Sequence, residues 1–195
     1  MSKYSIEDNK KLIEEYPFLL PRNRWTDKIP EDYDYSYTEL DSMPDGWREA
    51  FGEFICRDIK NELLKISNKA LDNFRIIDIK EKYGSLRFYC TETNREISMI
   101  IAKYEYLSQF ICLECGKFEA HTFNYGWIFT LCDDCFKNLL KKQSNNSNYN
   151  IFKEKDEPLE NEIIYEIYSN GKKETIHINL EDTIKEIRER ISTWQ

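Results

Sequence analysis

The sequence predicts an α+β fold in which helices pack on a small antiparallel sheet. Apolar side chains recur at helical spacing over residues 45–66 and 96–108, and a strand–turn–strand pattern lies between them at 74–90. A second hairpin, followed by an amphipathic helix, occupies residues 160–195 as a ββα appendage. Helices and strands grouped in this way, without strict alternation, are typical of an α+β domain.

The composition of the chain argues against some classes of function. The net charge of −8 repels nucleic acid overall and favours basic partners. There is no run of about 18 apolar residues and no apolar leader near the N-terminus, so we expect a cytoplasmic protein without membrane contact. Six cysteines in a reducing compartment indicate metal binding before disulfides.

The first element is a short helix over residues 5–16. Ser5 suits the N-cap, and Asp8 lies at the capping-box distance from it. Pro17 and Pro21 then end the helix and force an extended path.

Residues 31–45, EDYDYSYTELDSMPD, contain six acidic side chains and three tyrosines but no Lys or Arg. In an extended chain the three tyrosines would project to one side and pin the segment to the core, with their hydroxyls in water. The acids near its end would cap and start the next helix. The residues with this capping role are Asp41, Ser42 and Asp45.

Two other interpretations of this segment stay open. The first is a strip that binds a basic partner, since aromatic residues dominate binding hot spots; it consists of Tyr33, Asp34, Tyr35, Tyr37 and Asp41. The second is a Ca²⁺ or Mg²⁺ site, although EF-hand spacing is absent; its ligands would be Asp32, Asp34, Glu39, Asp41 and Asp45.

The core is expected to contain two longer helices. The helix over 45–66 is locally weakened by Gly46 and Gly52, and its apolar face consists of Trp47, Phe51, Phe54, Ile55, Ile59 and Leu63. Two strands follow around the turn at Tyr83-Gly84. The helix over 96–108 points Ile97, Ile100, Ile101 and Tyr104 inward. Together these elements form an α+β core over residues 1–110.

The sharpest motif is a pair of Cys-x2-Cys sequences separated by 16 residues. It places Cys112, Cys115, Cys132 and Cys135 on two tight turns, a spacing that fits one tetrahedral, structural Zn²⁺. Gly116 supplies a residue that tolerates positive φ. The intervening segment can form a hairpin around Asn124-Tyr125-Gly126, which completes a zinc ribbon over residues 111–142.

The alternatives are four ordinary thiols, a redox pair, or a catalytic zinc. Four thiolates leave no open position for water, so a structural role is favoured over a catalytic one. Cys56 and Cys90 lie on apolar faces and are expected to be core thiols. His121 is a surface or outer neighbour of the ribbon, and His177 faces solvent.

A polar stretch over residues 143–159 predicts a linker. The appendage beyond it has a type I′ turn at Asn170-Gly171 and a final helix over 182–194. The apolar side of that helix consists of Ile184, Ile187, Ile191 and Trp194. Such a small unit either docks on the main domain or pairs its hairpin with another chain as a homodimer.

The sequence contains few residues in patterns that suit a catalytic site. The two histidines lack a partner in a nucleophile motif and no phosphate-binding loop is present, so we expect no enzyme. Nucleic-acid binding is the alternative function, through Arg22, Arg24, Lys82 and Arg87 with interleaved aromatic rings. The Lys and acidic residues of the ribbon sum to zero, which weakens this interpretation.

The segments RNRWTDKIPEDYDYSYTELDSMPDGWREAFG, IKEKYGSLRFY, ICLECGK and LCDDC occur in an order that resembles a group of uncharacterised zinc-knuckle proteins of bacteriophages and prophages. The likeness covers roughly residues 16–137. It implies the four cysteines as metal ligands and a bacterial host cell, and it brings no established activity. The C-terminal hairpin and helix resemble the start of ubiquitin-like β-grasp domains, without their later strands or diglycine tail.

The expected function is therefore a phage-associated, zinc-stabilised protein-binding module. Its partner would be a host protein, including a defence factor that the module inhibits. A nucleic-acid-binding zinc ribbon is the alternative.

Overall fold

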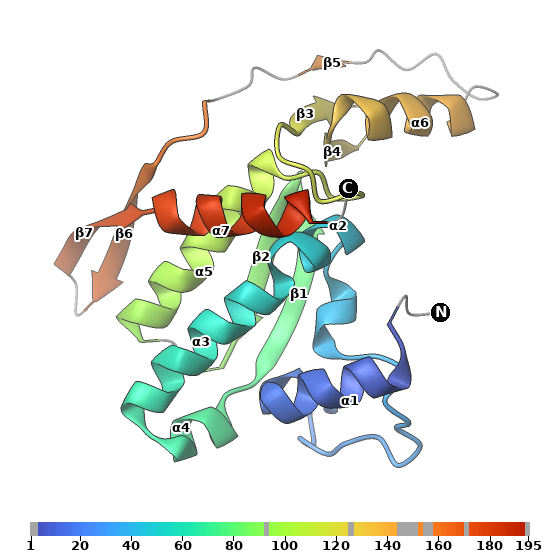
Figure 1. Cartoon of the computed structure of the whole chain (residues 1–195). Coiled ribbons are helices and arrows are strands. Elements are labelled where there is room, and N and C mark those ends of the chain that lie inside the picture. The colour runs from blue at the N-terminus through green and yellow to red at the C-terminus, as the bar shows by residue number, and fades with distance from the viewer. Residues whose placement is uncertain are drawn as a thin grey trace.

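A computed structural model describes residues 4–91, 94–124, 127–143, 152–153, 158–169 and 172–193 (Figure 1). It confirms the α+β class. The helices are α1 (Ile6–Glu15), α2 (Asp45–Trp47), α3 (Glu53–Ile66), α4 (Asn68–Asn73), α5 (Arg95–Leu107), α6 (Asp133–Gln143) and α7 (Glu181–Ser192). Short 3-10 turns are η1 (Pro17–Leu19), η2 (Glu39–Ser42) and η4 (Ser108–Phe110), and η3 (Arg48–Gly52) is a π-helical turn.

The strands form three small antiparallel sheets. Their bounds are β1 (Ile76–Lys82), β2 (Ser85–Cys90), β3 (His121–Asn124), β4 (Ile128–Leu131), β5 (Phe152–Lys153), β6 (Glu162–Ser169) and β7 (Lys172–Asn179). The sheets pair β1 with β2, then β4, β3 and β5 in that order, and β6 with β7. Within the described chain, no helix is long and apolar enough to cross a membrane.

Two predicted turns lie partly or wholly outside the described residues. The turn of β3–β4 includes residues 125–126, and that of β6–β7 is residues 170–171, so their predicted types remain predictions. Trp194 also lies outside. Most of the predicted linker over 143–159 is not described either. Its residues 152–153, however, form β5 and pair with β3, so this part of the linker belongs to a sheet.

Local signals fixed the first helix and the first hairpin as predicted. The Ser5 hydroxyl accepts the backbone N–H of Asp8, whose carboxylate binds back to Ser5 in a capping box. In the hairpin, Tyr83 (φ 55°) and Gly84 (φ 76°) both adopt the left-handed conformation between the paired residues Lys82 and Ser85. A two-residue turn with this geometry matches the twist of antiparallel strands.

The helix predicted over 45–66 forms, but it is interrupted by the π-helical turn η3. Most of its expected apolar face is buried, while Phe54 is half-buried against the core. The buried members are Trp47, Phe51, Ile55, Ile59 and Leu63. On α5, Ile97 and Tyr104 are buried as predicted, and Ile100 and Ile101 pack at the core margin.

The predicted start of this helix is confirmed for Asp45, which lies in the first turn of α2, and is wrong for Asp41 and Ser42. Pro44 occupies the N-cap of α2, and no side chain caps it. Asp41 and Ser42 lie in the preceding turn η2, where Asp41 forms a capping box with Thr38 and accepts its backbone N–H at 2.7 Å. Asp41 also pairs with Arg48 at 2.7 Å, and the Arg48 side chain is only 5% exposed. The acid therefore neutralises a buried guanidinium in η3.

We expect Asp41→Ala to destabilise the fold by about 3 kcal/mol, because it leaves Arg48 as a buried, unpaired cation. Asp34→Ala is the matched control, since Asp34 is exposed and its carboxylate accepts hydrogen bonds from the neighbouring Ser36. Urea unfolding would measure both variants. Equal midpoints for the two would show that the Asp41–Arg48 pair contributes nothing.

The tyrosine segment is not extended, which corrects the predicted one-sided projection. Tyr35 has φ 66°, so the chain turns there. The rings still gather, with centroids 5.0 Å apart for Tyr33–Tyr35 and 5.3 Å for Tyr33–Tyr37. The hydroxyls were expected to lie in water, but that of Tyr33 donates to the carbonyl of Tyr37. The side chain of Asn9 donates to the carbonyl of Tyr35 at 2.9 Å. Tyr33 and Tyr35 pack against the core, as pinning requires.

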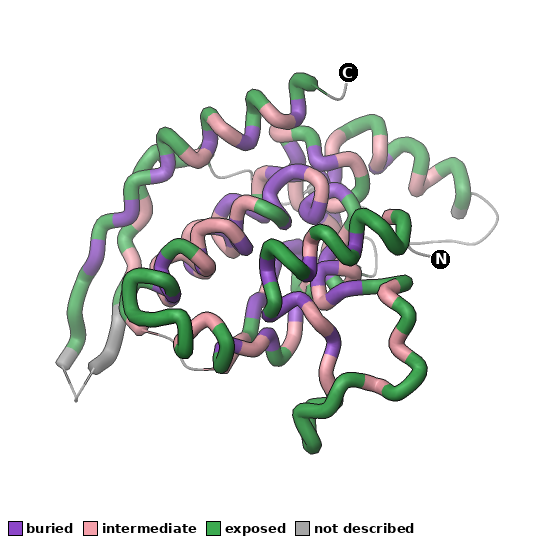
Figure 2. Tube along the Cα trace, turned by 60° about the horizontal axis from the view of Figure 1, so that its bottom comes forward, coloured by how far each residue is buried: buried purple, intermediate pink, exposed green. Residues whose placement is uncertain are grey.

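The C-terminal ββα unit docks on the main domain. Its apolar residues belong to the same hydrophobic cluster as α3 and α5, and α7 turns its buried side towards the core (Figures 1 and 2). These residues are Ile176, Ile178, Leu180, Ile184, Ile187 and Ile191.

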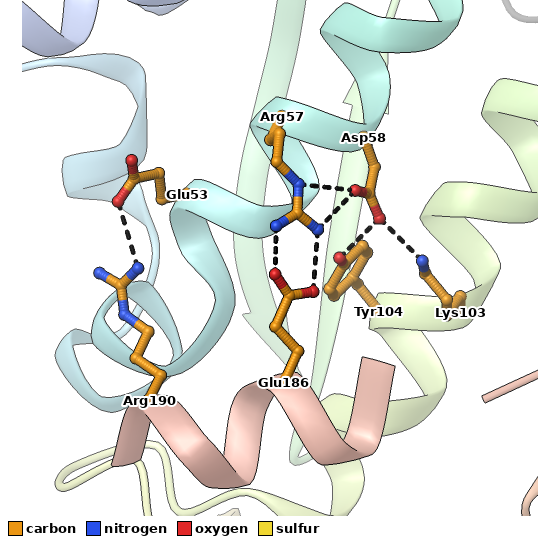
Figure 3. Close-up of polar contacts among 7 residues, drawn as sticks. All are labelled: Glu53, Arg57, Asp58, Lys103, Tyr104, Glu186 and Arg190. Atoms are coloured by element: carbon orange, nitrogen blue, oxygen red, sulfur yellow. Dashed lines mark hydrogen bonds and ion pairs between the residues drawn. The ribbon is translucent and has the colours of Figure 1, made fainter. Parts of the chain in front are cut away.

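A polar network surrounds this contact (Figure 3). Arg57 on α3 binds both carboxylate oxygens of Glu186 on α7 and also contacts Asp58. Asp58 accepts from Lys103 and from the Tyr104 hydroxyl, each at 2.8 Å. Burial alone would raise the pKa of Asp58, but the charge of Lys103 and these hydrogen bonds lower it. The network therefore joins α3, α5 and α7 through one ionised carboxylate.

Candidate metal centre

The four cysteines predicted as ligands converge in space. The sulfur atoms of Cys112, Cys115, Cys132 and Cys135 all lie within 4.8 Å of one another. Within the part of the chain that the structure describes, no other group of His, Cys, Asp or Glu residues converges in this way. The alternative of a Ca²⁺ or Mg²⁺ site among the acids of residues 31–45 therefore finds no assembled ligand group in the described chain.

The spacing of the sulfurs suits a shared ion. Cys115 Sγ and Cys132 Sγ are 3.7 Å apart, far beyond the ~2.05 Å of a disulfide. Four thiolates held at ~2.3 Å from a tetrahedral Zn²⁺ would lie ~3.8 Å from each other. All six cysteines are free thiols. The arrangement is thus compatible with one metal site.

The first pair lies on a tight turn after η4. The backbone N–H of Gly116 donates to the carbonyl of Cys112 at 2.9 Å, and that of Cys112 to the carbonyl of Lys117 at 2.8 Å. Gly116 has φ 73°, as its predicted role requires. This turn folds both sulfurs to the same side.

The second pair lies where β4 meets α6, a helix that the sequence analysis did not predict. Cys132 precedes α6 and Cys135 lies in its first turn. Phe136 on α6 stacks on Phe123 of β3 with ring centroids 3.7 Å apart. The hairpin predicted between the two cysteine pairs forms as β3 and β4, with α6 added after it, and the zinc ribbon over 111–142 stays a prediction.

Electrostatics favour a cation among the sulfurs. Burial raises the pKa of Cys112 to about 11, even though backbone N–H groups point to its sulfur. Burial and the charge of Cys112 raise the pKa of Cys135. For Cys132, hydrogen bonds outweigh burial and lower the pKa. Four thiolates so close repel each other, and a central cation would remove that repulsion.

The first cysteine turn rests directly on the core helix. Trp47 is fully buried and donates its indole N–H to the carbonyl of Ile111 at 2.7 Å. The N–H of Gly46 donates to the carbonyl of Leu113 at 2.8 Å. A Cβ atom on Gly46 would lie 2.2 Å from the carbonyl oxygen of Cys112. The absence of a side chain at Gly46 therefore lets the first cysteine turn approach α2 closely. The sequence analysis predicted only that Gly46 weakens the helix.

A second contact joins the segment that carries the four cysteines, residues 111–142, to the β1–β2 turn. This segment is called the cluster module. Thr130 on β4 is fully buried and donates its hydroxyl to the carbonyl of Gly84 at 2.5 Å. The N–H of Leu113 donates to the carbonyl of Thr130 at 3.0 Å, which links the two cysteine turns. Core and cluster module are thus packed together at two separate points.

The remaining Cys and His residues stand apart from the cluster. Cys56 is fully buried and Cys90 half-buried, and burial raises the pKa of Cys90 to about 12. Both fit the predicted role of core thiols. His177 is exposed and paired with Glu162, whereas His121 is half-buried with its ring 6.3 Å from Phe123.

The cations proposed for nucleic acid are mostly engaged with acids or carbonyls. Arg22 contacts Asp27 and Arg24 pairs with Asp78. Arg87 folds back onto the Ser85 hydroxyl and the carbonyl of Leu86, and Lys82 lies over the ring of Tyr83.

Trp25, which the sequence analysis considered only as a ring beside Arg22 and Arg24 for nucleic acid, is 94% exposed in a loop held by hydrogen bonds. The Asn23 side-chain oxygen accepts the N–H groups of Trp25 and Thr26 at 2.9 and 3.0 Å. Asp27 is held by Arg75 and has φ 55°. The turn had a signal in the sequence, because an Asn side chain often accepts the backbone N–H two residues later.

Comparisons of this chain with protein-family models, with curated proteins and with solved structures find no match.

Proposed function

We propose that the chain is a non-enzymatic protein-binding module whose four cysteines hold one structural Zn²⁺. Four thiolates would fill the coordination sphere and leave no position for a reacting water. The 3.7 Å separation of Cys115 and Cys132 supports a tetrahedral site. The metal would hold the two cysteine turns together and would take no part in a reaction.

Protein binding is supported chiefly by Trp25. An indole that is 94% exposed contributes almost nothing to folding, yet its loop is fixed by the contacts of Asn23 and Asp27. An aromatic side chain on a backbone that is fixed before binding reduces the ordering cost when it enters a partner's pocket. The resemblance to phage and prophage proteins would place that partner in the bacterial host. Inhibition of a host defence factor belongs to this proposal.

We expect Trp25→Ala to reduce capture of a host protein by about 30-fold, equivalent to a hot spot of about 2 kcal/mol, with no change in thermal midpoint. Tagged protein and host lysate at physiological salt, with quantitative mass spectrometry, would measure it. Trp127→Ala is the matched control, because that indole is 56% exposed but donates to Glu81. Equal recovery with wild type and Trp25→Ala, or no reproducible partner, would contradict the proposal.

Single-stranded nucleic acid remains the competing candidate. Lys80 and Arg87 lie directly opposite each other on β1–β2, and Tyr89 next to them is 44% exposed. Such a like-charged pair suits a backbone of phosphates. The acid Asp78, however, pairs with both Lys80 and Arg24. Salt-dependent gel shifts with an oligothymidine would test this function, and no shift at low salt would exclude it.

A further inference from the structure

The outer edge of β6 is an unprotected strand edge. β6 and β7 form a sheet of two strands, so β6 pairs on one side alone within the described chain. The edge of β2 is treated differently. There the N–H of Leu86 donates to the Ser108 hydroxyl at 2.8 Å and that of Phe88 to the Glu105 carboxylate at 3.0 Å. Side chains thus block β2 but leave β6 open for pairing.

A groove runs along this edge. It has a volume of about 960 Å³ and lies between β6 and β2, with one face of α5 as its floor. The Tyr106 hydroxyl on that floor accepts the N–H of Glu160 at 3.1 Å, which fixes the start of β6 against α5. Figure 1 shows β6 beside α5. The groove is therefore formed before any ligand arrives.

The charge of the groove is negative. Glu105, Glu160 and Glu162 line it, against the single cation Arg87. Glu105 is half-buried, and burial raises its pKa. Ile164, also in the lining, is 65% exposed. The groove thus offers a strand edge, apolar side chains and an excess of carboxylates to a basic ligand, although Glu105 also accepts the N–H of Phe88 and Glu162 contacts His177.

A second copy of the chain fits this edge poorly. Two-fold pairing of β6 with itself around Ile164 would set Glu162 opposite Glu166 of the copy, and β6 contains no Lys or Arg. Like charges directly opposite each other destabilise a strand pair. The groove on the other side of the hairpin is nearly balanced in charge, because Asp58 pairs with Lys103 and Glu62 with Lys65, which leaves Glu96 as its one further acid.

We propose that the groove binds an extended, basic segment of a partner protein, which adds as a strand to β6 and points Lys or Arg side chains at Glu105 and Glu160. The proposal rests on the protein-binding function and names its partner chemistry. Backbone pairing would supply affinity, and the carboxylates would select basic side chains.

The test uses the full chain and three labelled nine-residue peptides. One alternates Val and Lys, the second has the same sequence with alternate backbone nitrogens methylated, and the third alternates Val and Glu. Fluorescence anisotropy at physiological salt should show binding of the Val-Lys peptide alone. Glu160→Lys should weaken it at least ten-fold, whereas Glu96→Lys, an equal charge change beside the nearly balanced groove, should not.

Four results would overturn the proposal. They are no binding of the Val-Lys peptide up to millimolar concentration, equal binding of its methylated form, equal loss in both variants, and a dimer by light scattering that Glu160→Lys dissociates. The lysate capture separates the two proposals. If wild type captures a partner that Glu160→Lys still retains, the groove proposal fails and the protein-binding function stands. If wild type captures nothing, the function itself fails.

Discussion

Cys112→Ser is expected to lose stoichiometric zinc and to lower the thermal midpoint by about 10 °C or more. Structural zinc contributes about 10–16 kcal/mol of binding free energy in small metal-dependent domains, and losing one of four ligands removes a large part of it. A loss of several kcal/mol shifts the midpoint of a chain of this size by ~2–4 °C per kcal/mol. Cys112 is fully buried, and its neighbour Ile111 accepts the indole N–H of Trp47, so the loss also affects the core.

Native mass spectrometry and calorimetry would check this expectation, with and without a chelator. Wild type should carry one zinc per chain and lose stability when the metal is removed. Cys90→Ser is the matched control, because Cys90 is a half-buried thiol outside the cluster. A wild-type chain without metal, or equal shifts in both serine variants, would contradict the structural role of zinc.

Gly46→Ala is expected to destabilise the chain by about 3 kcal/mol and to weaken zinc retention. The added methyl group would lie 2.2 Å from the carbonyl oxygen of Cys112 and 2.5 Å from the backbone nitrogen of Gly116. Both atoms belong to the first cysteine turn, so either α2 or that turn must move. The loss should appear in urea unfolding and in competition with a zinc chelator.

Gly52→Ala is the control in the same helical segment. Its Cβ atom would lie 3.4 Å from the Cγ atom of Arg48, an ordinary contact, and alanine favours a helix over glycine by up to about 1 kcal/mol. This variant should keep zinc and match or exceed wild type in stability. Equal stability and equal zinc retention in the two glycine variants would show that the close approach of Gly46 to the cysteine turn does not affect stability.

Elements with a local cause were predictable from the sequence. The capping box of Ser5, the left-handed turn at Tyr83-Gly84 and the paired cysteines each depend on a few neighbouring residues, and all three appear in the structure. The clustering of the sulfurs follows from the spacing of the two pairs, although spacing alone does not identify the metal.

Features that depend on distant partners were not predictable. Asp41 seemed suited to start α2, but its partner is the buried Arg48 within a π-helical turn. Gly46 seemed a weak point in a helix, because the cysteine turn that contacts it lies over 60 residues later in the chain. The helix α6 was missed because it begins within the second cysteine pair and its residues were assigned to the ribbon.

The docking of α7 has a consequence for biosynthesis. Arg57 and Glu186 are separated by 129 positions, so the part of the core that α7 covers stays exposed until the ribosome has made and released residues 181–192. Contacts between such remote segments slow the search for the native state. A nascent chain stalled before Glu181 should therefore recruit chaperones and be cut by protease, whereas one released beyond Ser192 should resist cleavage.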